Sequence, residues 1–227
     1  MLTFEAEGIV YIGRWDYLLF PIYFLLFYFI AGKIKNDRIE QDDRFKYFRR
    51  ALTVKVIGGL VFNLIYYFYY QGGDTGDYFK SCKAIGSMIF IHPSVAITTI
   101  FGNNGMENWT AYINNDLLTP CWSHYFYKPP EFMVAQLSAV FVLLGSVHLY
   151  PGTLVLDCFL FIGLWKFYIM CTDVYPQLKE RLVIPIFFIP SVIFWSSGIM
   201  KDAWCLSCAC WFTVNIYKIF IKKEKVY

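Results

Sequence analysis

The chain has 227 residues, of which 58% are hydrophobic and only 16% are charged. Soluble domains carry about 25% charged residues, so this composition excludes an ordinary soluble domain and predicts an integral membrane protein. The net charge of +3 is small, and the basic residues cluster at the ends of apolar segments. That pattern is typical of membrane topology and not of nucleic-acid binding, so we expect the lipid bilayer as a partner and no nucleic acid.

Apolar segments long enough for membrane-spanning helices, which need about 20 residues, recur along the sequence. We expect an all-α, polytopic fold in a single membrane domain covering 1–227. Its five spans are expected near 15–32, 51–70, 153–171, 182–199 and 203–221. The segment 33–50 carries seven basic and four acidic residues, which predicts a cytoplasmic loop. The following segment, 71–131, is therefore predicted to be one long external loop.

The apolar segment 132–149, which ends at Tyr150, Pro151 and Gly152, decides the parity of the topology. If it spanned the membrane, the basic tail after residue 221 would lie outside, against the positive-inside rule. We therefore predict an interfacial or re-entrant helix on the outer face. This places the tail, Lys179 and Arg181 inside, and it places 196–202 outside together with the loop 71–131.

An acidic, glycine-rich stretch at 71–80 follows the second predicted span, which ends in a cluster of tyrosines. Tyrosines gather at membrane interfaces, so Asp74 and Asp77 are expected at the membrane edge. A partly desolvated carboxylate there is suited to acid–base chemistry. The simpler interpretation is a solvated turn, which the neighbouring glycines alone would favour. The rest of the loop is rich in aromatic residues and is expected to form helices along the membrane surface.

The stretch 196–202 ends in Lys201 and Asp202, at a predicted helix junction on the same side as Asp74. A lysine at this place can bind a phosphate group as a point charge. The alternative is a snorkelling lysine at an ordinary helix start. His124, in the external loop, is a further candidate for substrate binding, although a loop histidine with an ordinary hydrogen-bond partner is the simpler interpretation.

No metal site is expected from the cysteines. Cys205, Cys208 and Cys210 have a suggestive spacing, but they lie in an apolar segment with no histidine nearby. The identity of any cofactor stays open.

The motifs at 72–78, 128–132 and 190–202, together with the long external loop, resemble the GT-C class of polytopic glycosyltransferases. This class includes bacterial lipid-A and rhizobial sugar transferases and protein O-mannosyltransferases. Its first external loop carries the catalytic carboxylate, and its donor is a polyprenyl-phosphate-linked sugar. Family members are usually longer and have more spans, and no extra span precedes their acidic loop. The resemblance therefore allows this chain to be part of a longer member.

The resemblance implies a multi-pass protein of the bacterial inner membrane that contributes to cell-envelope polysaccharide. Asp74 would act as the general base or orient the acceptor, and Asp77 would position a divalent cation or Lys201. Lys201, with Asp202 beside it, would pair with the lipid phosphate. Tyr78 and Trp195 would stack on sugar rings.

Two other classes of function remain open at this point. One is a polysaccharide polymerase or another membrane protein that handles lipid-linked sugars. The other is a non-catalytic membrane subunit or a transporter. Transporters place ionisable residues within spans, and here Lys55, Asp157 and Lys166 qualify. Asp157 and Lys166 are nine residues apart and would not pair on one helix, which weakens the transporter interpretation.

Overall fold

The computed structural model describes residues 4–6, 9–102 and 129–223, and these form an almost wholly helical fold, which confirms the all-α prediction. A short antiparallel hairpin, β1 (Phe4–Ala6) and β2 (Ile9–Ile12), precedes the helices. The helices follow in the order α1 (Arg14–Arg38), η1 (Asp43–Tyr47), α2 (Phe48–Phe68), α3 (Gly73–Met88), α4 (Pro93–Ile100), α6 (Pro129–Leu144), α7 (Leu149–Val174), η4 (Pro176–Leu178), α8 (Lys179–Phe187), α9 (Pro190–Trp195), α10 (Lys201–Ile216) and η5 (Tyr217–Lys222).

Four helical segments of the described chain are long and apolar enough to cross a membrane. They are α1, η1 joined to α2, α7, and α10 joined to η5, and they coincide with four of the five predicted spans. Helix α1 carries a row of exposed apolar side chains, including Leu18, Ile22, Leu25 and Phe29. In water such a surface would be unfavourable, whereas in a bilayer it contacts lipid.

The predicted span at 182–199 differs from the structure, because it is not one continuous helix. It is divided into α8 and α9, with a break at Phe188 and Ile189. Pro190 begins α9, and its ring forces Ile189 into an extended conformation with ψ of 123°. Helix α8 therefore cannot continue through this position.

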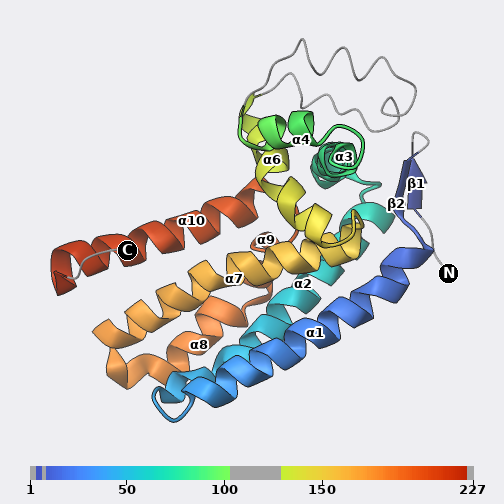
Figure 1. Ribbon diagram of the computed structural model, residues 1–227. Helices are drawn as coiled ribbons and strands as arrows, with labels where there is room; N and C mark the ends of the chain where they lie inside the picture. The colour runs from blue at the N-terminus through green and yellow to red at the C-terminus, as the bar shows by residue number, and fades with distance from the viewer. Residues whose placement is uncertain (1–3, 7–8, 103–128, 224–227) are drawn as a thin grey trace.

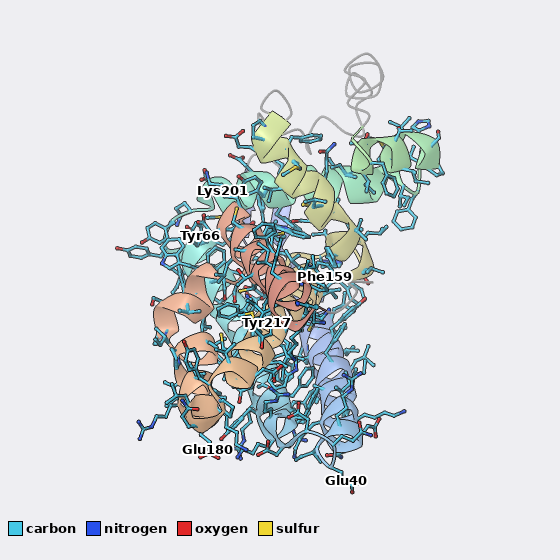
Figure 2. All side chains as sticks on the ribbon, turned by 90° about the vertical axis from the view of Figure 1, so that its left-hand side faces the viewer. Glu40, Tyr66, Phe159, Glu180, Lys201 and Tyr217 are labelled. Carbon is cyan, nitrogen blue, oxygen red and sulfur yellow. The ribbon has the colours of Figure 1, made fainter. Side chains whose placement is uncertain are left out.

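The bundle has two ends, which Figure 2 marks by Lys201 and Glu180. The Glu180 end joins η1, α7, α8 and η5 through ion pairs. Arg44 bonds to Asp173 at 2.6 Å, Lys46 bonds to Glu180 at 2.7 Å, and Lys179 bonds to Asp43. The segments 33–50 and 172–181 and the end of the last helix thus lie together, as an arrangement with one cytoplasmic face requires.

The Lys201 end carries α3, α4 and α6, which lie across the ends of α2 and α7 in Figure 1. Helix α6 has 16 residues, and a tight turn joins it to α7. Gly145 and Gly152 pack backbone to backbone there, since a Cβ on Gly145 would lie 2.2 Å from the Gly152 nitrogen. Helix α7 begins at Leu149, four residues before the predicted start of the span at 153–171. Pro151 fits the first helical turn, where its missing N–H is not needed.

Candidate functional site

The acidic stretch after α2 forms a short turn followed by a helix. Gln71, Gly72 and Gly73 have positive φ angles of 61°, 105° and 56°, a conformation that favours glycine. Helix α3 begins at Gly73, so Asp74 and Asp77 lie on a helix and not within a solvated turn. Asp74 lies in the first turn and is exposed, whereas Asp77 is half-buried. A negative charge in the first helical turn is stabilised by the helix dipole.

Asp74 shares its surroundings with carboxylates from two other helices. The phenol of Tyr78, whose residue is 1% exposed, has its pKa raised to about 12 by burial and by the charges of Asp74, Glu131 and Asp202. Tyr66 of α2 is likewise within electrostatic reach of both Asp74 and Asp202. The first turns of α3 and α10 therefore lie at the same end of the bundle.

Lys201 and Trp195 lie at the same end, on either side of the junction between α9 and α10. Lys201 is exposed (Figure 2) and forms no ion pair with a carboxylate of the described residues. Trp195 is 50% exposed and packs edge-on against Phe194, which contacts the ring of Phe62 at 5.0 Å. Of the two aromatic residues expected to stack on a sugar, only Trp195 is exposed, because Tyr78 is buried.

The junction itself is held by a buried ion pair inside the bundle, which we call the clamp (Lys55, Asp157 and the backbone at 196–198). Lys55 of α2 and Asp157 of α7 lie 3.5 Å apart, with 4% and 0% of their side chains exposed. The Lys55 ammonium also donates to the carbonyl and hydroxyl of Ser196 and to the hydroxyl of Ser197. The Gly198 N–H donates to Asp157 at 3.3 Å.

The clamp explains how a non-helical segment can be buried. The backbone at 196–200 is fully buried but has left the helical hydrogen-bond pattern, so its polar groups need other partners. Lys55 satisfies a carbonyl and Asp157 accepts from an N–H of this segment. Gly198 has a φ of 87°, and a Cβ there would lie 2.4 Å from the Phe62 ring. Only glycine fits at this position.

A second buried carboxylate fixes the turn between α6 and α7. Asp16 of α1 is 1% exposed and accepts from the backbone N–H groups of Gly13 and Tyr150, each at 3.0 Å. Its other neighbour is the His148 ring, at 3.2 Å. Tyr23 of α1 donates to the Leu144 carbonyl at 2.8 Å. The end of α6 is thus attached to the side of α1 at the Lys201 end.

No protein-family model, curated protein or solved structure matches the chain. The site therefore has to be interpreted from its own geometry.

The structure brings most of the expected site residues to one end of the bundle. Asp74, Asp77, Tyr78, Trp195, Lys201 and Asp202 lie there, while His124 lies outside the described residues. No group of three His, Cys, Asp or Glu side chains that could hold a metal ion is found in the described part of the chain. Sequence reasoning missed Glu131, Tyr66 and the pairing of Lys55 with Asp157. The only sequence signal for the clamp was the presence of two charges within apolar segments.

Proposed function

We propose that this is a multi-pass membrane glycosyltransferase with its active site at the Lys201 end, on the outer face of the bacterial inner membrane. The observation that carries the proposal is that Asp74, in the first turn of α3, and Asp202, in the first turn of α10 beside Lys201, both act electrostatically on Tyr66 and Tyr78. These stretches are far apart in the sequence. This end of the bundle therefore presents an exposed carboxylate and an exposed cation near a cluster of tyrosines.

The topology that we propose follows from the two ends of the bundle. Helices α8 and α9 together lead from the Glu180 end back to the Lys201 end, so the pair acts as the fifth crossing. Helix α6 starts and finishes near the Lys201 end and acts as an interfacial or re-entrant helix. Irregular backbone at membrane depth is tolerated where it is buried in protein. The segment 196–200 is buried in this way, and the clamp supplies hydrogen-bond partners for it.

In the proposed reaction, the bond between the sugar anomeric carbon and the polyprenyl phosphate breaks, and a new bond forms to an acceptor hydroxyl. Asp74 takes the hydroxyl proton, and the phosphate leaves as an anion beside Lys201. Tyr78 remains protonated at neutral pH because its pKa is about 12, so it does not compete as a base. Trp195 provides the sugar-stacking surface.

The experiment is a transfer assay with Asp74→Asn in membranes that contain the protein, using radiolabelled polyprenyl-phosphate mannose and glucose as donors. The substitution keeps the size of the side chain and removes its basicity, so we expect a loss of about 10²–10⁴-fold in rate. The control is Asp37→Asn, which makes the same change at an exposed position near the Glu180 end and should keep full activity. Full turnover by Asp74→Asn would refute the assignment. Transfer only from a lipid-linked repeat unit would favour the polymerase alternative.

The buried ion pair does not make transport a stronger candidate. Both charges are instead engaged with each other and with the backbone at 196–198, which favours a structural role.

A further inference from the structure

We infer that the Glu180 end binds an anionic phospholipid in a groove between α1, η1, α7 and the last helix, with two lysines holding its phosphate. This inference depends on the membrane placement of the chain but not on sugar transfer. The groove has a volume of about 470 Å³. We call it the basic groove, and its walls include Phe45, Phe48, Ile162, Trp165, Val214 and Tyr217.

Helix α7 contacts the last helix at each end of the basic groove. Midway along α7, Gly163 packs against α10 so closely that a Cβ would lie 2.6 Å from the Ser207 hydroxyl. At the Glu180 end, Lys222 bonds to Asp173 at 2.8 Å. Between these contacts the wall is largely aromatic and aliphatic, which suits an acyl chain.

The charges in the basic groove do not balance. Its lining holds four basic residues, Arg38, Lys166, Lys218 and Lys222, and two acidic residues, Asp42 and Asp173. Both aspartates are already paired with Arg44, and Asp173 also with Lys222. Arg38, Lys166 and Lys218 have no ion pair with any described carboxylate. The basic groove therefore carries excess positive charge within an apolar wall.

Lys166 and Lys218 are the residues that would receive an anion. They come from different helices, and each lies within repulsive reach of the other's charge. The Lys166 ammonium rests on the Trp211 ring at 3.6 Å, and neither lysine is fully exposed. Two like charges on a partly apolar surface are unfavourable unless an anion neutralises them.

The position of these lysines favours a lipid phosphate over a phosphate from solution. Lys218 is four residues before Lys222, so it lies about one helical turn from the Glu180 end. A phosphate at this level is at headgroup depth, and the apolar wall continues toward the bilayer centre. Basic pockets between helices on the cytoplasmic side are known to hold anionic headgroups.

The test measures lipid binding to the purified protein in detergent by native mass spectrometry. The probe is dioleoyl phosphatidylglycerol, and the comparison ligands are dioleoyl phosphatidylcholine and inorganic phosphate. We expect tight binding of phosphatidylglycerol alone. At about 1 kcal/mol for each lysine, Lys166→Gln with Lys218→Gln should weaken it roughly thirtyfold. A matched control, Lys33→Gln with Lys35→Gln, removes the same charge outside the groove and should bind normally.

Two further variants keep the test decisive if the double glutamine variant fails to fold. Lys166→Arg with Lys218→Arg retains the charge and should retain the lipid. Met170→Trp places a large ring in the groove wall and should reduce binding without any loss of charge. Unchanged binding in the folded glutamine variant would overturn the inference. Equal binding of phosphatidylcholine, or of inorganic phosphate, would overturn it as well.

Discussion

Asp74 and Asp157 are two carboxylates on either side of the same junction, and their surroundings are opposite. Asp74 is exposed in the first turn of α3, at the Lys201 end of the bundle. Asp157 is fully buried, pairs with Lys55 and accepts from the Gly198 backbone. Asp157 therefore holds the backbone that leads into α10, whereas Asp74 is the carboxylate to which we assign the chemistry in the proposed function. The two sites should therefore respond to mutation in different ways.

Removing one member of the buried pair should have the largest effect on stability. Lys55→Met leaves Asp157 buried without its counter-charge and leaves the Ser196 carbonyl without its donor. Breaking a buried pair in this way typically costs about 3–5 kcal/mol. The measurement is the free energy of unfolding in mixed micelles, followed by circular dichroism during a denaturant titration.

A double variant separates charge from packing. Lys55→Met combined with Asp157→Leu removes both charges, so no buried charge is left uncompensated, and it should recover much of the lost stability. If the double variant is as unstable as the sum of the two single variants, the pair does not act as one unit. The clamp would then be reduced to two independent hydrogen-bonding groups.

The close packing behind Asp157 gives a second, smaller prediction. A Cβ on Gly59 would lie 1.9 Å from the Asp157 carboxylate, so Gly59→Ala must displace a carboxylate that the clamp holds. Overpacking of this kind costs about 1–3 kcal/mol. Gly32→Ala is the matched control, because its Cβ would meet only the Arg49 side chain, at 3.6 Å. It should be neutral or slightly stabilising in a helix. Equal behaviour of the two variants would contradict the close contact.

Part of this fold could be predicted from the sequence. Runs of apolar residues identified the four long helices, since length and composition suffice for that. Spacing along the chain relates residues on one helix, such as Asp157 and Lys166, so it does not reveal the clamp. The partner of Asp157 is on another helix, where no spacing rule applies. Lys166 instead contacts the Trp211 ring.

Helix boundaries near prolines were the other weakness. Pro185 lies inside α8, Pro190 begins α9, and Pro151 lies in the first turn of α7. The same residue type therefore interrupts one helix and is accommodated in two others. A proline is accommodated in a helix where its missing N–H is not needed and where the residue before it can adopt the required conformation. Both conditions depend on packing that the sequence does not display.

The smallest effect on stability is expected at Asp74. This variant tests most directly whether Asp74 and Asp157 have different roles. Asp74→Asn removes a negative charge from the first turn of α3, where the helix dipole stabilises such a charge by about 0.3–1 kcal/mol. The loss should not exceed this range, because the side chain is exposed. The measurement is the same unfolding titration, carried out on the preparation used for the transfer assay. A large loss of rate with this small loss of stability would separate Asp74 from Asp157. If Asp74→Asn instead unfolds the protein as Lys55→Met does, Asp74 is a structural residue and the base must be sought elsewhere at the Lys201 end.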